Sequence, residues 1–192
     1  MRGAITIVLL AIQLGCLASG NRPPVVSTAA PGTNALAPSG SATAKKGASS
    51  PMKTAKEECE ELMNSVVPFA EQMLSQHREF YPFGGAMDSN GALVAVGGHT
   101  GTEHPPSADV IAVLEKGFQQ AAKEGKYKAT ALVVDMLVVP PGKATKQDAI
   151  AVRLDHRDGY SVVVVFPYVI GPGGAVLDAP YAVAGEQRIF AR

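Results

Sequence analysis

Residues 127–168 read YKATALVVDMLVVPPGKATKQDAIAVRLDHRDGYSVVVVFPY, and they decide the fold. Three runs rich in valine and other β-formers are separated by short polar segments, which predicts strands at about 127–139, 148–156 and 160–168. Arg157-Asp158-Gly159 joins the last two runs and fits a three-residue hairpin loop with glycine at the left-handed position. We therefore expect three consecutive antiparallel strands.

A register for the first pair follows from the apolar pattern. Placing Met136 opposite Val152 sets Asp135 directly across from Arg153, a cross-strand ion pair worth under about 1 kcal/mol. One face then carries Leu132, Val134, Met136 and Val138 with Ile150, Val152 and Leu154, and the other carries Ala131, Val133, Leu137, Ala149, Ala151, Val163 and Val165. Both faces are apolar, as in a sheet covered on both sides. The cover expected for the second face is the first helix, with the C-terminal segment or a partner protein as alternatives.

The elements before these strands are two helices and a hairpin. A helix is expected from Thr54 to about Gln76, kinked or split at Pro68. Its apolar stripe is Leu62, Val66, Phe69, Met73 and His77. Asn90-Gly91 predicts a hairpin between strands 83–88 and 92–98, with positive φ at both turn residues. A second helix is expected from Ser107, as its capping residue, to about Lys123.

The predicted fold class is α+β, with an antiparallel sheet of about five strands, two main helices and the order α-β-β-α-β-β-β. A short last strand near 187–191 and apolar anchors at Tyr181, Ile189 and Phe190 are also expected. Over residues 54–168 this order resembles the roadblock and profilin-like folds.

A second resemblance rests on short segments. Phe80-Tyr81-Pro82-Phe83-Gly84, followed later by Asp148-Ala149-Ile150 and Pro167-Tyr168, is similar to a group of small bacterial proteins with no assigned activity. Some members of that group resemble immunity proteins, and the resemblance therefore implies binding to a protein toxin.

The first twenty residues have the pattern of an export signal. Arg2 precedes an apolar run at 4–12, which has the length of a signal-peptide core. Gly15-Cys16 then resembles the bacterial lipobox, which implies lipidation at Cys16, although Gln13 stands where that pattern usually has leucine. Cleavage after Gly20 and an uncleaved apolar start are the alternatives. The predicted location is outside the cytoplasm, either lipid-anchored to the cell membrane or outer membrane, or periplasmic or secreted.

Residues 21–50 are mostly Pro, Ala, Ser, Thr and Gly and lack bulky apolar side chains. Such a segment is expected to stay disordered, because it cannot bury enough surface to offset its ordering entropy. As a flexible tether it would span about 30 Å; the alternative is an unstructured segment with no anchoring role. Residues 51–192 are expected to form a single domain.

The charge balance excludes some partner classes. The chain has 17 basic and 17 acidic residues and no tryptophan, so no nucleic-acid partner is expected and membrane contact is expected only through the N-terminal lipid. The two cysteines fit neither a disulfide framework nor a zinc site, and no cofactor is expected. Cys59 lies among glutamates that raise a thiol's pKa, so it is expected to be inert.

The strongest candidate for chemistry is the loop His99-Thr100-Gly101-Thr102-Glu103-His104. Its spacing is one residue longer than the inverted zincin motif, and it lies in a Gly- and Pro-bounded loop rather than on a helix. Loop 97–106 and turn 140–147 are instead expected to be recognition rims.

No nucleophile elbow or phosphate loop is present. The leading hypothesis is therefore a non-enzymatic binding or adaptor domain at the bacterial cell envelope, with an envelope protein or a second copy as partner. The alternative is an exported metal-dependent hydrolase that uses His99, Glu103, His104 and His156.

Overall fold

The computed structural model describes residues 53–191, which form two helices and a seven-stranded antiparallel sheet. The elements in chain order are α1 (Ala55–His77), β1 (Phe83–Asp88), β2 (Leu93–Gly97), α2 (Ser107–Lys123), β3 (Tyr127–Val138), β4 (Gln147–His156), β5 (Ser161–Gly171), β6 (Gly174–Leu177) and β7 (Tyr181–Ala184). The predicted α+β class and the order α-β-β-α-β-β-β are confirmed, and two short strands extend the sheet beyond the five expected.

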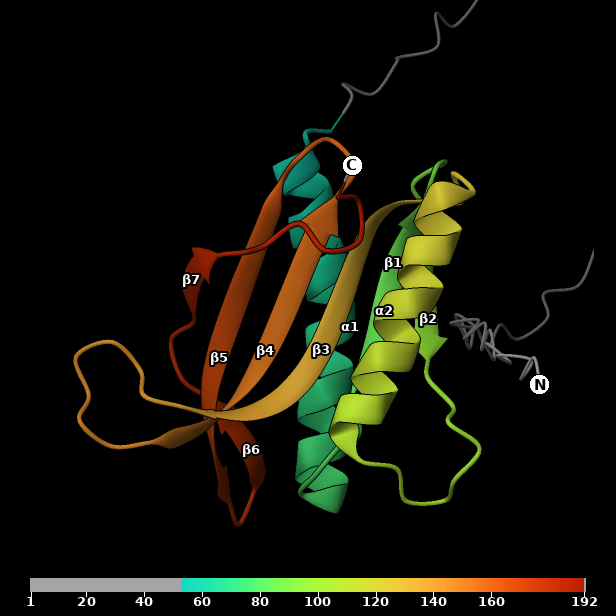
Figure 1. Ribbon diagram of the computed structural model, residues 1–192. Helices are drawn as coiled ribbons and strands as arrows, with labels where there is room; N and C mark the ends of the chain where they lie inside the picture. The colour runs from blue at the N-terminus through green and yellow to red at the C-terminus, as the bar shows by residue number, and fades with distance from the viewer. Residues whose placement is uncertain (1–52, 192) are drawn as a thin grey trace, which may run out of the picture. The chain divides into compact units, whose positions relative to one another are not determined.

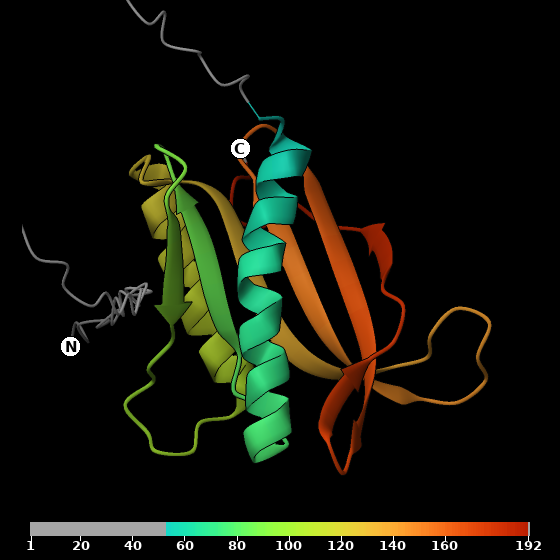
Figure 2. The same cartoon turned by 180° about the vertical axis from the view of Figure 1, so that it is seen from behind.

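The sheet lies between the two helices (Figures 1 and 2). Its strand order is β2-β1-β3-β4-β5-β6, and β7 also pairs with β5. Helix α1 packs against β1, β3, β4 and β6 on one face, while α2 packs on β3 and β1 on the other. Each face therefore has its own apolar core, and the expectation that the sheet is covered on both sides is confirmed, with a different helix on each face.

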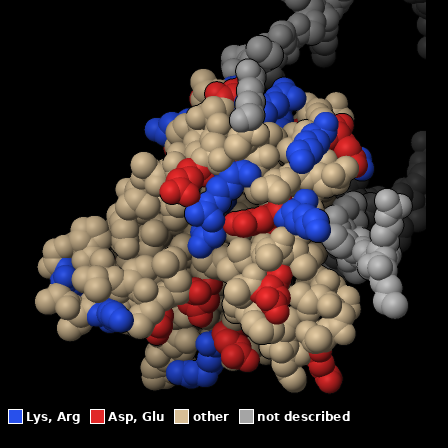
Figure 3. Space-filling view, in the orientation of Figure 1, with Lys and Arg blue, Asp and Glu red and all other residues tan. Residues whose placement is uncertain are grey.

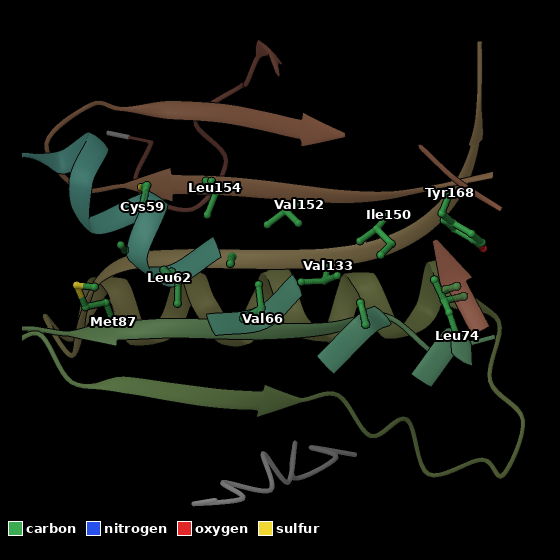
Figure 4. Close-up of a cluster of buried hydrophobic side chains, with 14 residues drawn as sticks. Cys59, Leu62, Val66, Leu74, Met87, Val133, Ile150, Val152, Leu154 and Tyr168 are labelled. Atoms are coloured by element: carbon green, nitrogen blue, oxygen red, sulfur yellow. The ribbon is translucent and has the colours of Figure 1, made fainter. Parts of the chain in front are cut away.

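Helix α1 begins at a complete capping box, in which Thr54 and Glu57 satisfy each other's backbone N–H groups. Pro68 lies inside the helix without splitting it. The predicted stripe is partly wrong, because Phe69 is 43% exposed and His77 is exposed. The buried positions are Cys59, Leu62, Val66, Ala70 and Leu74, spaced by three and four residues, and Figure 4 shows four of these side chains against the sheet.

The predicted register between β3 and β4 is wrong by three residues. Val133, not Met136, lies opposite Val152. A shift by an odd number of residues exchanges the faces, so Ala131 and Val133 join Ile150 and the other even-numbered residues of β4 in the core under α1. Alternation in the sequence could not reveal this, because both faces of these strands are apolar.

The predicted ion pair between Asp135 and Arg153 is therefore also wrong. Asp135 lies opposite Ile150 and accepts a hydrogen bond from the Tyr168 hydroxyl at 3.0 Å. Arg153 lies on the other face of the sheet, where its guanidinium is 3.6 Å from a carboxylate oxygen of Glu115 on α2.

The β1–β2 and β4–β5 hairpins use the same three-residue loop. Asp88 donates its N–H to Ala92 and accepts from Gly91, and His156 bonds to Tyr160 and Gly159 in the same way. In the first loop only Gly91 has positive φ, so the two-residue turn expected at Asn90-Gly91 is wrong although the hairpin is present. The loop before Tyr160 was predicted correctly.

The C-terminal segment after β7 lies across the α2 side of the sheet, and the strand predicted near 187–191 does not form. One carboxylate oxygen of Asp155 accepts the backbone N–H groups of Arg188 and Ile189, both at 2.8 Å. Tyr181 and Ile189 pack against the α2-side core, as expected of apolar anchors.

In the described part of the chain, neither helix has the length and apolar character needed to cross a membrane. The predicted export signal with Cys16 and the predicted tether at 21–50 lie outside the described residues.

Candidate functional site

Three exposed apolar side chains lie together on the α2 side of the sheet, and we call them the terminal patch: Met136, Val169 and Val176, which are 40%, 58% and 61% exposed. Ala149 pairs with Met136 on one side and with Pro167 on the other, so both partners point to the same face. Val169 is two residues beyond Pro167 on that face, and it pairs directly with Val176. Helix α2 packs mainly on β1 and β3 and leaves this end of the sheet open.

The β5–β6 hairpin that carries two of these valines is fixed to α1. The hydroxyl of Ser75 accepts the backbone N–H of Ala175 at 3.0 Å. Gly174 has φ +112°, and a Cβ on it would lie 2.7 Å from that hydroxyl oxygen. Glycine at this position therefore allows both the turn and the close contact with the helix, and the hairpin is held as a rigid extension of the sheet.

Polar side chains of the turn before β4 and of the segment after β6 lie beside the terminal patch. In the turn before β4, the Lys143 ammonium bonds to Asp178 and to Gln147, both at 2.9 Å. The bond from Lys143 lowers the pKa of the Asp178 carboxyl. On the opposite face of the sheet, burial raises the pKa of Asp135, and the Tyr168 hydroxyl offsets part of that rise. An apolar centre with a polar rim is the usual arrangement of a protein-binding surface.

The predicted rims, loop 97–106 and turn 140–147, extend from the same end of the domain as the β5–β6 hairpin (Figures 1 and 2). In the first of them His99, Glu103 and His104 are all exposed. The His104 Nδ1 is 3.3 Å from the Tyr81 hydroxyl. Within residues 53–191, no group of three or more His, Cys, Asp or Glu side chains is arranged to hold a metal ion.

His156 does not join this loop. It ends β4 at the opposite end of the sheet and is 1% exposed, on the α1 side. Its Nδ1 accepts the backbone N–H of Asp158 at 3.1 Å, which leaves Nε2 as the protonated nitrogen that donates to Glu58 at 2.9 Å. The alternative hypothesis of a metal-dependent hydrolase grouped His156 with the loop residues, and the structure separates His156 from them.

Glu58 connects His156 to a buried cation, Lys128. Its other oxygen accepts from the Lys128 ammonium at 2.5 Å, and both side chains are only 12% exposed. Burial raises the pKa of Glu58, but the bonds from Lys128 and His156 outweigh it and the net pKa is lowered. The neighbouring thiol of Cys59 is fully buried, and burial, with added repulsion from nearby carboxylates, raises its pKa to about 12. This agrees with the expectation that Cys59 is inert.

A cavity of about 240 Å³ lies between α2, β4, β5 and the C-terminal segment. Its polar lining includes Glu115, Arg153 and Arg188, and Figure 3 shows acidic and basic side chains next to one another near the middle of this face. Asp155 also lines it; burial raises the pKa of this carboxyl, and its Oδ1 has no hydrogen-bond partner among the described residues. The space is smaller than the roughly 300–1,000 Å³ typical of ligand pockets. Asp155 anchors the C-terminal segment through its hydrogen bonds to the backbone, and this role accounts for a carboxylate at this buried position.

The terminal patch was not identified from the sequence. Val169 follows a strand that was expected to end near 168, and Val176 follows the break at Gly171-Pro172-Gly173-Gly174. The signal that could have found it was a second apolar segment after a glycine-rich turn, which indicates a hairpin.

The comparisons with known proteins give no relative from which a site could be transferred. No protein-family model, no curated protein and no solved structure matches the chain.

Proposed function

We propose that the chain is a non-enzymatic binding domain of the bacterial cell envelope and that its terminal patch receives an apolar segment of a partner protein. The observation that carries this proposal is the pairing of two valines, Val169 and Val176, that are each more than half exposed on a rigid hairpin. Exposed apolar side chains grouped on one face and bordered by polar residues mark interaction sites more often than single exposed ones do.

The energetic scale suits such a role. Full burial of one valine or methionine side chain is worth about 1.5–3 kcal/mol, which corresponds to roughly a tenfold to hundredfold change in Kd. Three such residues on a preformed surface support specific binding with little ordering cost, because the hairpin and the strand ends are already fixed.

The proposed place in the cell rests on the leader. The apolar run at 4–12 followed by Gly15-Cys16 supports export and lipid attachment. Intact-mass analysis of the full chain expressed in bacteria, with and without Cys16→Ala, tests it. A membrane-bound form that begins at Cys16 with added acyl mass, and that is lost in the variant, supports the anchor; a soluble form that begins near Asn21 refutes it.

The binding role is tested with Val176→Lys in the full chain and Val183→Lys as its matched control. Val183 is also an exposed strand valine, 47% exposed, but it lies on β7 away from the terminal patch. Proteins cross-linked to the chain in bacterial envelopes are identified by mass spectrometry, and the strongest is purified for titration. We expect Val176→Lys to weaken binding at least tenfold and Val183→Lys to leave it unchanged. Equal binding by both variants refutes the role of the terminal patch.

A further inference from the structure

The outer edge of β2 is an unprotected strand edge. Within the described residues β2 pairs only with β1, whereas the outer edge of β5 is shared by β6 and β7. The segment 92–98 contains no charged residue and no proline, which are the features that usually prevent edge strands from pairing. An edge of this kind tends to acquire another strand.

The hydrogen bonds at the β1–β2 turn determine which backbone groups of β2 point outward. Asp88 donates to Ala92, so these two residues form a hydrogen-bonded pair. Such pairs alternate along an antiparallel ladder, and with the observed register the next ones are Ala86 with Val94 and Gly84 with Val96. The N–H and C=O groups of Leu93, Ala95 and Gly97 therefore face away from β1.

These three residues are all exposed. Leu93 is 42% exposed, and a Cβ built on Gly97 meets no atom within 4 Å. The edge thus offers one large apolar side chain and one open position, separated by Ala95.

We infer that the β2 edge is a self-association surface, where β2 of a second copy of this chain pairs antiparallel about a two-fold axis at Ala95. In that arrangement Ala95 lies opposite its own copy, and Leu93 lies opposite Gly97, whose open position accommodates the leucine. On the other face Val94 lies opposite Val96. Each outward-facing residue exchanges both backbone hydrogen bonds with its partner, and the closed symmetry leaves no edge for a third copy.

The sequence of β2 favours a second copy over an unrelated strand. The alternation of large and small side chains about Ala95 is self-complementary, and the absence of charge removes self-repulsion at the axis. The contact is short, so it falls below the roughly 1,200–2,000 Å² of a standard interface unless α1 and α2 add to it. A dimer that dissociates on dilution is therefore expected.

A charge exchange at Ala95 tests the inference. All variants are full-length chains on a common Cys16→Ala background, which removes the acylation site, and their masses are measured by analytical ultracentrifugation over a wide concentration range. Ala95→Lys and Ala95→Glu each place like charges opposite one another at the axis, so each is expected to be monomeric. An equimolar mixture of the two is expected to restore the dimer, because the axis then joins opposite charges.

Two further variants separate pairing from folding. Ala95→Pro removes an outward-facing donor without removing a β1–β2 hydrogen bond, and it should abolish the dimer while the circular dichroism spectrum stays unchanged. Val176→Lys changes the terminal patch but not the edge and should keep the dimer, so the two proposals fail independently. A wild-type chain that is monomeric at every concentration, or lysine and glutamate variants that do not recover the dimer when mixed, would overturn the inference.

Discussion

The buried carboxylate of Glu58 is expected to be a principal source of stability, and Glu58→Ala tests this. The carboxylate accepts from the Lys128 ammonium at 2.5 Å and from the His156 imidazole at 2.9 Å, and both donors are largely shielded from water. Removing one member of a buried ion pair costs about 3–5 kcal/mol, because the remaining charge is left without a partner. The lower value is expected here, since the Lys128 chain is long enough to extend toward solvent.

Glu60→Ala is the matched control on the same helix. The Glu60 carboxylate is 50% exposed and lies 3.7 Å from Lys56, a surface pair worth under about 0.5 kcal/mol. Urea unfolding followed by circular dichroism should show a loss of about 3 kcal/mol for Glu58→Ala at an unchanged m-value. A loss of this size lowers Tm by roughly 10 °C for a domain of this length. If the two variants lose the same free energy, the buried network does not stabilise the fold.

The pH dependence gives a second measurement. The folded-state pKa of Glu58 is lowered from its ordinary value of 4.5, so the unfolded chain binds the proton more readily. The stabilisation is complete above pH 4.5 and is lost as the pH falls through the lowered folded-state pKa. The free-energy difference between wild type and Glu58→Ala should therefore shrink in acid. A difference that stays constant as the pH is lowered would contradict the assigned ionic bonds.

Three further outcomes are expected. The Cys59 thiol should not react with a thiol reagent such as Ellman's at mildly alkaline pH until the chain is denatured, because its pKa is raised to about 12 and it is fully buried; rapid labelling of the native domain would refute this. Gly174→Ala should destabilise the domain by about 1–3 kcal/mol, because alanine is strained at positive φ and its Cβ would meet α1. Gly173→Ala is the control and should cost much less, because a Cβ at Gly173 meets no atom within 4 Å. The two variants are compared by thermal unfolding. A double-mutant cycle between Glu115 and Arg153 should give a coupling energy under about 1 kcal/mol but above zero, and no measurable coupling would count against the corrected register.

The local elements of this fold follow from short-range chemistry, and the sequence predicted them closely. The bounds of α2 are close to those expected, because Pro106 precedes it and Gly125, with φ +70°, follows it. Ser107 was predicted as its capping residue, and this is wrong: Ser107 is the first helical residue, Pro106 occupies the N-cap position, and no side chain caps the helix. The loop ending at Gly159 was also recognised, because glycine is the residue that adopts positive φ without strain. Caps, turns and strand-forming runs act over a few residues, so they can be inferred without knowing what packs against them.

The arrangement of these elements was decided by contacts between distant residues. Strands β3 and β4 are apolar on both faces, so the sequence pattern fits registers that differ by an odd number of residues equally well. Packing of Val66 and Leu62 against the small residues Gly85 and Ala131 favours one of them. The same contacts separate Asp135 from Arg153 and place Glu58 beside His156, ninety-eight residues along the chain. The terminal patch likewise depends on tertiary packing: α2 packs on β1 and β3 and does not extend over Val169 and Val176, so these valines stay exposed. No local pattern in the sequence contains that information.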